Sequence, residues 1–217
     1  MCAFPVMQKL SCLAMLVSAL VGCAWGQTYE VSVAGGLTRM STAPLGSVSA
    51  EDPLDDDTSF KKNAYGYGGR LTYNPYDYYG HEVGYRFTRA SLRTSIPDAD
   101  GNRTTFEDKV AIHQAFYNFL IYFMPKGERW RPFITGGVQA FNFANPHITG
   151  WTGVATRNYG MNYGGGLKLK LFNHALVRFD LRDYYTTKPY ILNPQDITNF
   201  SGWQRHQEGS VGIAIGF

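Results

Sequence analysis

The residues with the clearest chemical potential lie near the C-terminal end, where His206, Glu208 and Ser210 occur at every second position. A serine nucleophile needs a base beside it and a third group that orients the base. Alternate residues of a strand lie on one side of it, so the three could be neighbours. The strand pattern around them accounts for this spacing without catalysis. We therefore expect no catalytic site.

An acidic segment offers oxygen atoms that could bind a divalent cation. Its members are Glu51, Asp52, Asp55, Asp56 and Asp57. Their spacing differs from that of a calcium-binding EF-hand loop, and two lysines follow them. A solvated loop is the expected structure, and we expect no metal site.

Cofactor chemistry also lacks support in the sequence. All three cysteines occur by position 23, so the chain after them has no thiolate ligand or disulfide. The glycine-rich stretch from Tyr163 to Gly166 lacks the lysine and the helix of a nucleotide-binding loop. We expect no cofactor. The formal net charge of +3 gives no indication of nucleic-acid binding.

Charged residues of both signs recur at alternate positions, with Gly, Ala, Ser and Thr between them on the same face. The predicted network consists of Arg70, Glu82, Arg86, Lys168, Arg178, Asp180, Arg182 and Glu208. Large apolar residues occupy the opposite face of each segment. If the segments close into a barrel, the charges line a narrow lumen, where buried charges must pair. We expect a structural network rather than a conducting path.

Period-two alternation predicts that these residues lie on strands. Eight segments show it, at residues 29–38, 65–74, 81–88, 110–123, 131–143, 159–171, 175–185 and 209–217. Residues 110–123 are apolar on both faces toward their end, so a helix competes there. Their aromatic content and the Met124-Pro125 ending favour a strand.

Short and long connections alternate along the chain. The short ones are residues 75–80, 125–130 and 172–174, and the long ones are about 41–63, 93–105, 144–158 and 186–203. Short turns at one end and long loops at the other are typical of transmembrane β-barrels. The sequence therefore predicts an all-β, eight-stranded antiparallel up-and-down transmembrane barrel.

The direction in which the apolar face points separates a membrane barrel from a soluble one. In a soluble barrel the charged residues face water and the apolar ones fill the interior. Mean hydropathy is −0.24, which suits a membrane protein only if it is a barrel. Tyrosines near several strand ends match interfacial aromatic girdles. We expect the apolar residues to face lipid, with the soluble barrel as the alternative.

The N-terminal 26 residues have the layout of a secretory signal peptide. Lys9 precedes an apolar run from Leu10 to Ala24, and Ala24-Trp25-Gly26 forms a small-x-small cleavage sequence. We expect cleavage after Gly26 and a barrel domain at 27–217. A retained membrane anchor is one alternative. Lipidation of Cys23, after a lipobox-like Leu20-Val21-Gly22, is another.

Three stretches resemble the OmpA-type family of eight-stranded outer-membrane barrels. They are Val211-Gly212-Ile213-Ala214-Ile215-Gly216-Phe217, Arg131-Pro132-Phe133-Ile134-Thr135-Gly136-Gly137, and Tyr163-Gly164-Gly165-Gly166-Leu167-Lys168 continuing into Leu176-Val177-Arg178-Phe179-Asp180. The resemblance covers residues 28–217 and implies location in the bacterial outer membrane. It implies that the assembly machinery reads Val211, Ile213, Ile215 and Phe217. Membrane lipids and lipopolysaccharide are the other implied partners.

The expected function is a non-enzymatic role in envelope integrity or surface contact. A porin-like channel for small solutes is the first alternative, and a lipid-modifying barrel enzyme is the second. A soluble lipocalin-like binder is the third. The sequence leaves the ligand and the oligomeric state open.

Overall fold

The computed structural model describes residues 28–48, 58–97, 102–151, 153–172, 174–192 and 202–217. The expected signal peptide and the acidic segment 51–57 lie outside these residues. So do Cys23 and the cleavage position after Gly26.

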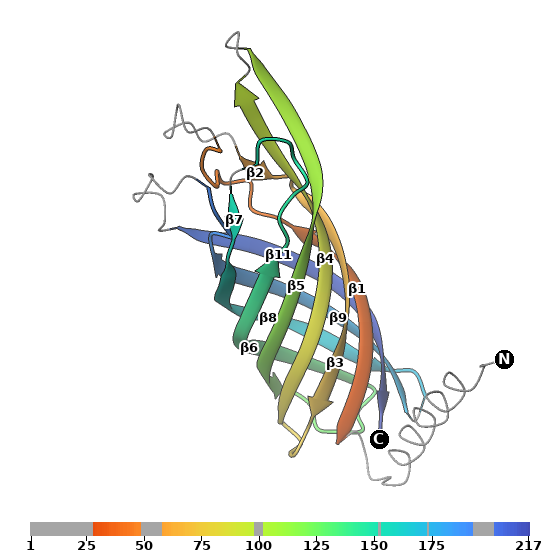
Figure 1. The fold of residues 1–217 in the computed structure, drawn as a ribbon. Coiled ribbons are helices and arrows are strands. Elements are labelled where there is room, and N and C mark those ends of the chain that lie inside the picture. The colour runs from red at the N-terminus through yellow and green to blue at the C-terminus, as the bar shows by residue number, and fades with distance from the viewer. Residues whose placement is uncertain (1–27, 49–57, 98–101, 152, 173, 193–201) are drawn as a thin grey trace, which may run out of the picture.

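Eight long antiparallel strands form a closed barrel, as predicted (Figure 1). They are β1 (Tyr29–Arg39), β3 (Asn63–Tyr73), β4 (Tyr79–Pro97), β5 (Arg103–Tyr122), β6 (Trp130–Phe143), β8 (Arg157–Lys170), β9 (Ala175–Thr187) and β11 (Trp203–Gly216). Each pairs with the next, and β1 pairs with β11 from Glu30↔Gly216 to Arg39↔Gln207. This last pairing removes the open sheet edges.

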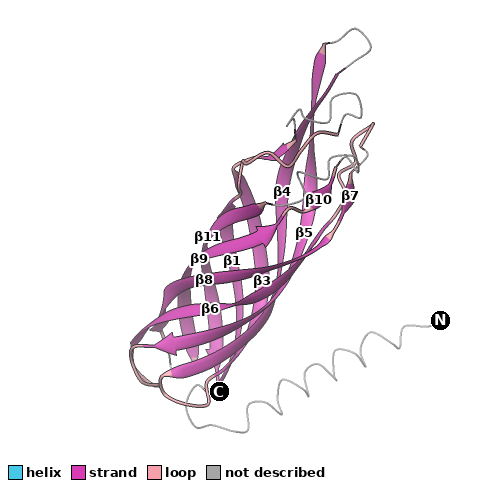
Figure 2. Ribbon diagram, turned by 90° about the vertical axis from the view of Figure 1, so that its left-hand side faces the viewer, coloured by secondary structure: helices cyan, strands magenta, loops and turns pink. Residues whose placement is uncertain are grey.

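Three short strands lie among the loops at one end of the barrel (Figure 2). They are β2 (Ser59–Phe60), β7 (Val154–Ala155) and β10 (Tyr190–Ile191). β2 pairs with β4, and β7 pairs with β10 across two of the long loops.

The alternation predicted from sequence is confirmed, with the apolar side facing outward. On β11, Val211, Ile213 and Ile215 are 51%, 59% and 55% exposed, whereas Ser210 and Ala214 are buried. The helix considered for residues 110–123 is wrong, because β5 is a strand throughout. Among the described residues, no helix has the length and apolar character to cross a membrane.

β4 and β5 are much longer than the sequence predicted. Their pairing continues to Pro97↔Arg103, through the segment expected to be a loop. β3 pairs with β4 only as far as Arg89, so the rest of the hairpin leaves the barrel wall as a ribbon (Figure 1). The turn-forming residues after Pro97 led to the prediction of a loop. The strand continues instead, because the buried Leu92 and Thr94 alternate with outward-facing residues.

The interior divides into two parts. The half next to the short turns holds the predicted charged residues, together with a small apolar cluster of Leu120, Tyr122 and Phe133. The half next to the long loops is an apolar cluster of Met40, Leu45, Val48, Phe60, Ala64, Ala90, Leu92, Val110, Ile112, Phe141, Phe143, Tyr190 and Leu192. The sequence predicted a polar, packed lumen and did not predict this apolar cluster. The long loops supply Leu45, Val48, Tyr190 and Leu192, which bury apolar surface that strand patterning alone does not assign to a core.

Candidate functional site

The centre of the lumen holds a network of two carboxylates and three guanidinium groups. Arg178 and Arg182 of β9 both donate to Glu82 of β4, and the Arg182 Nη2–Glu82 Oε1 distance is 2.7 Å. Asp180 accepts from Arg178 at 2.8 and 2.9 Å and from Arg182 at 3.1 Å. Arg70 of β3 donates to Asp180 Oδ2 at 2.6 Å. All five side chains are buried, so the ion pairs tie β3 and β4 to β9 across the barrel.

A second cluster lies between this network and the apolar end. Arg86 Nη1 is 2.6 Å from Glu208 Oε1, and the Tyr184 hydroxyl donates to Glu208 Oε2 at 2.7 Å. Arg70 links the two clusters, since its Nη2 lies 4.0 Å from Glu208 Oε1. Gly66 makes room for Arg86, because a Cβ there would lie 2.8 Å from the guanidinium nitrogens.

A third cluster lies near the short turns. Lys168 Nζ is 2.5 Å from Glu30 Oε2 and donates to the Tyr122 hydroxyl at 2.8 Å. The Arg131 guanidinium stacks on the Tyr122 ring, 3.4 Å from its centroid. A cation over an aromatic face is favourable, more so when both groups are desolvated.

The structure places all eight residues of the predicted network in the lumen and brings seven of them into the two linked clusters. Lys168 is the exception, and its partner Glu30 was not in the predicted set. Glu30 falls on the polar face of the first alternating segment, so the sequence pattern could have placed it in the lumen. Tyr122 and Arg131 were also missed. Tyr122 is aromatic and lies in a segment that is apolar on both faces, and Arg131 begins a segment that alternates only weakly, so neither pattern indicates an interior side chain.

In the possible triad, Ser210 and His206 each hydrogen-bond to another group and not to one another, so they form no nucleophile–base pair. His206 Nδ1 accepts from the Ser41 backbone N–H at 3.0 Å. Glu208 binds Arg86 and Tyr184, as described above. Ser210 Oγ accepts from Arg70 Nη2 at 3.3 Å. Each of the three side chains thus bonds to a different element of the structure.

A small cavity of about 20 Å³ separates the second cluster from the apolar end. Thr38, His206 and Glu208 line its polar side, and Ile112 and Phe143 line the other. This space fits about one water molecule. Among the described residues, no group of three or more His, Cys, Asp or Glu side chains could hold a metal ion.

The residues of the expected assembly sequence lie at the seam of the barrel. Val211, Ile213 and Ile215 point outward from β11. The Phe217 backbone N–H donates to the Tyr29 carbonyl, and the Tyr29 N–H donates to the Phe217 carbonyl, both at 2.9 Å. The terminal aromatic residue therefore completes the pairing between the first and last strands.

No protein-family model matches the sequence, and no curated protein matches it. Similar solved structures exist. The outer-membrane protein OprG of Pseudomonas aeruginosa aligns with a TM-score of 0.60 at 12% identity, over 88% of this chain and 97% of that one. The N-terminal β-barrel domain of OprF from the same organism gives 0.51 at 15% identity, over 89% and 100%. Neisserial surface protein A gives 0.51 at 11%, also over 89% and 100%.

These similarities agree with the architecture built above and confirm the fold expected from the OmpA-type resemblance. A closed barrel whose exterior is apolar and whose interior is ion-paired matches a lipid environment. The chain therefore has the fold of an integral outer-membrane β-barrel.

Proposed function

We propose that this protein is a non-conducting, non-enzymatic barrel that presents an extended hairpin for contact at the cell surface. The observation that carries the proposal is the filling of the lumen at two successive levels, first by ion pairs and then by an apolar cluster. The hairpin supports the second half of the proposal.

The ion-paired level blocks the lumen with side chains that cannot move independently. Glu82 and Asp180 each accept hydrogen bonds from at least two arginines. Displacing one guanidinium separates that buried cation from its carboxylate partners, which costs about 3–5 kcal/mol. A hydrated solute would have to break several such pairs at once.

The apolar level forms a second barrier above the first. Phe143 lies between Phe60, Phe141 and Tyr190, with ring centroids 5.8–6.2 Å apart. Trp151 packs edge-on against Tyr190 at 5.2 Å. A polar solute would lose its hydration there without compensating hydrogen bonds. The two levels reject solutes for different physical reasons.

The β4–β5 ribbon is the part of the described chain that projects beyond the barrel (Figure 1). From Arg89 to Pro97 it extends roughly 25 Å at the usual rise per strand residue. Its outward side chains, such as Arg93, Glu107 and Thr104, are polar or charged and exposed. An exposed ribbon of this kind can reach a partner beyond the membrane surface.

Planar-bilayer recording tests the first half of the proposal. The purified, folded protein is expected to give no steady single-channel steps in symmetric salt. A porin reconstituted by the same procedure serves as the positive control. Reproducible steps from this protein would contradict the sealed lumen and favour the small-solute channel.

A shortened hairpin tests the second half. Residues 96–104 are replaced by Asn-Gly, a pair that favours a two-residue hairpin turn. The variant is expected to assemble like the wild type, while cells that produce it attach less to glass and settle more slowly. Equal attachment and settling would remove the hairpin as the contact element.

Lipid A composition tests the absence of enzymatic activity. Cells with and without the protein are expected to contain the same lipid A species by mass spectrometry. A species that depends on the protein would favour the lipid-modifying enzyme instead.

A further inference from the structure

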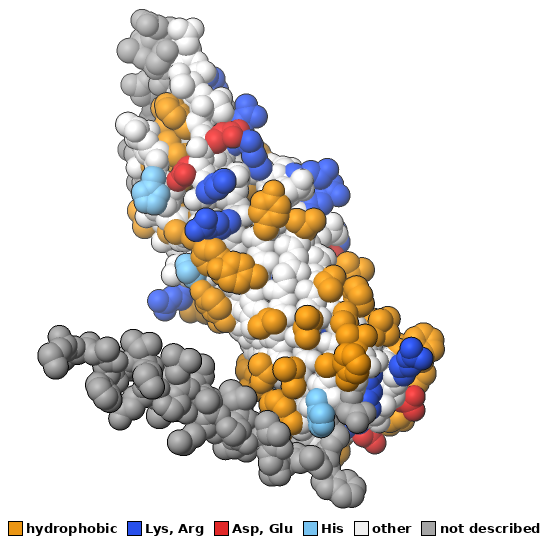
Figure 3. All heavy atoms as spheres, turned by 90° about the vertical axis from the view of Figure 1, so that its right-hand side faces the viewer, with side chains coloured by type: hydrophobic (Ala, Val, Ile, Leu, Met, Phe, Trp, Pro, Cys, Tyr) orange, Lys and Arg blue, Asp and Glu red, His pale blue; other side chains and the backbone are white. Residues whose placement is uncertain are grey.

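A basic groove lies on the outer surface of the barrel, on the opposite side of the wall from the apolar cluster. It is defined by Lys61, Lys62, Arg89 and Lys109, with a volume of about 660 Å³. Asn63, Tyr65 and Ser91 complete its lining. Figure 3 shows Lys and Arg side chains gathered beyond the hydrophobic band on one face of the barrel.

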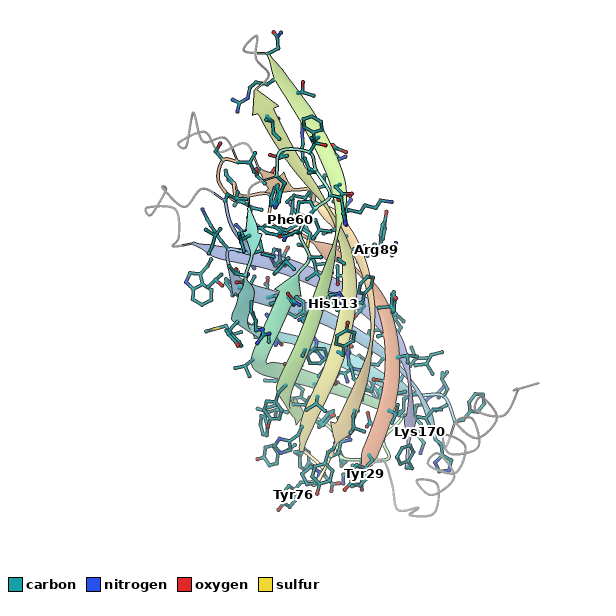
Figure 4. All side chains as sticks on the ribbon, viewed as in Figure 1. Tyr29, Phe60, Tyr76, Arg89, His113 and Lys170 are labelled. Atoms are coloured by element: carbon teal, nitrogen blue, oxygen red, sulfur yellow. The ribbon has the colours of Figure 1, made fainter. Side chains whose placement is uncertain are left out.

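Strand pairing brings the four cations together. The Lys61 backbone N–H donates to the Ser91 carbonyl at 2.8 Å, and Ser91 is the register partner of Lys109. Arg89 is the register partner of Tyr65. All four side chains are exposed, and Figure 4 shows Arg89 extending away from the barrel. The sheet therefore fixes where the positive charge lies.

This charge is only partly neutralised. Lys61 Nζ pairs with Glu107 at 2.6 Å. Within the part of the chain that the structure describes, Lys62, Arg89 and Lys109 have no carboxylate within ion-pair distance. Four cations and one carboxylate leave three positive charges in the groove. Arg93, the register partner of Glu107, adds a further cation at its upper edge.

An apolar hollow lies closer to the short turns, over β11, β1 and β3, and shares β3 and β4 with the groove. Its lining includes Val33, Gly35, Tyr67, Gly69 and Tyr85, and its volume is about 710 Å³. The two glycines create the hollow. A Cβ at Gly35 or Gly69 would meet its nearest atom at 3.9 or 3.8 Å, so the space above them is open.

The distance between groove and hollow matches one leaflet of a membrane. From Asn63 to Gly69 is roughly 20 Å along the strand. A strand tilt of about 40° reduces this to a depth of roughly 15 Å, which is half of a typical hydrocarbon core. The hollow thus lies where acyl chains lie when the groove is at the headgroup level.

We propose that the basic groove binds the phosphate headgroup of a phosphorylated lipid of the outer leaflet, with its acyl chains over the hollow at Gly35 and Gly69. Clustered Lys and Arg side chains at a membrane surface attract anionic headgroups. The juxtaposition of uncompensated cations with an apolar hollow on the same strands suits a ligand that carries both parts. The inference goes beyond the proposed function and holds whether or not the lumen conducts.

Native mass spectrometry of the folded, full mature chain in non-ionic detergent tests the proposal. The probes are lipid A with both phosphates and the same lipid A after enzymatic dephosphorylation. We expect the wild type to bind the phosphorylated probe about tenfold to a hundredfold more tightly, because three cations act on it.

Two charge-matched variants locate the site. K62Q/R89Q/K109Q leaves the Lys61–Glu107 pair intact and is expected to abolish the preference for the phosphorylated probe. K126Q/R129Q/K170Q removes three cations at the short-turn end and is expected to keep it. Faster migration of the unheated sample on a gel verifies that each variant is folded.

Three outcomes overturn the proposal. One is unchanged binding by K62Q/R89Q/K109Q. Another is an equal loss in both variants, which means diffuse electrostatic attraction. The third is a wild type that binds both probes alike.

The hollow is tested separately with Gly35→Leu and Gly69→Leu. Both positions face outward with open space, so folding is expected to be preserved. Each variant should bind six-chain phosphorylated lipid A more weakly than the wild type, with no change toward inorganic phosphate. Unchanged lipid A binding in both variants would show that the acyl chains lie elsewhere, which contradicts this part of the proposal.

Discussion

At the scale of single residues, each carboxylate at the centre of the lumen binds more than one arginine. Asp180 accepts hydrogen bonds from Arg70, Arg178 and Arg182, and Glu82 accepts from two of these arginines. Removal of one carboxylate therefore takes a buried partner from two or three arginines at once and leaves the other carboxylate to neutralise them. The same change at an exposed pair leaves the charges to water, which screens them.

Glu82→Ala is expected to lower the free energy of unfolding by about 3–5 kcal/mol, because it strips Arg178 and Arg182 of a buried partner. Urea titration in lipid vesicles, followed by tryptophan fluorescence, measures the change. Glu107→Ala, at a half-exposed pair, is the control and should cost less than about 1 kcal/mol. Equal losses in the two variants would show that burial does not control the strength of these pairs.

Asp108 anchors a long loop to the base of the ribbon. Its Oδ2 accepts from the His147 backbone N–H at 2.6 Å, and the His147 Nδ1 atom is 3.6 Å away. The backbone hydrogen bond from His147 lowers the pKa of the Asp108 carboxyl below its usual value. A depressed carboxyl pKa stabilises the folded form above the unfolded pKa of about 3.9, and this contribution disappears as pH falls through the folded pKa.

Hydrogen exchange at the His147 amide should follow this titration. Protection is expected near neutral pH and should be lost only as pH falls past the unfolded value of about 3.9 and through the lowered pKa of Asp108. Asp108→Ala should show low protection across the whole range. A protection factor that is the same in the variant and the wild type at neutral pH would show that another group holds the loop.

At the scale of the elements, the seam between β1 and β11 depends on the last residue of the chain. The backbone of Phe217 exchanges two hydrogen bonds with Tyr29. Its side chain takes no part in this pairing. Backbone closure and any recognition of the aromatic ring are therefore separable.

The variant Phe217→Ala tests backbone closure separately from recognition of the aromatic ring. Refolding of the purified variant into detergent should match the wild type, because the backbone pairing survives. The amount assembled in the outer membrane of cells should fall severalfold if the assembly machinery reads the ring. Full assembly in cells would argue against that partner. A refolding defect would mean that the side chain has a structural role.

At the scale of the whole molecule, the barrel has an apolar exterior and a closed ring of paired strands. Large apolar side chains face outward along every long strand, while the charged side chains of the lumen network are buried. Closure by the β1–β11 pairing satisfies the backbone without a free edge. Such a barrel resists unfolding by detergent at room temperature but not by heat.

Gel migration tests this closure directly. After extraction in detergent, the unheated protein should migrate faster than a boiled sample, since a compact barrel binds less dodecyl sulfate than an extended chain. Gly66→Leu, which would clash with Arg86, should reduce the fast-migrating fraction. Identical migration of heated and unheated wild type would contradict a stable closed barrel.

The sequence by itself determined the strands and their two faces. Alternation is a property of a single strand, because successive side chains point to opposite sides whatever the strand pairs with. Alternation therefore places Val211, Ile213 and Ile215 on one face of β11 and Glu208 and Ser210 on the other without knowledge of the fold. The charges of both signs and the small residues on the second face, rather than the alternation, predicted that this face lines the lumen.

Only the tertiary structure decided which charges meet and where the polar lumen ends. Glu30 and Lys168 are 138 positions apart, and their contact depends on the curvature and stagger of the closed barrel. The apolar end depends on loop residues such as Leu45 and Leu192 folding back. The basic groove depends on the link between β2 and β3, which holds Lys61, lying beside Arg89 of β4 and Lys109 of β5. These are non-local contacts, and a local alternation pattern does not encode them.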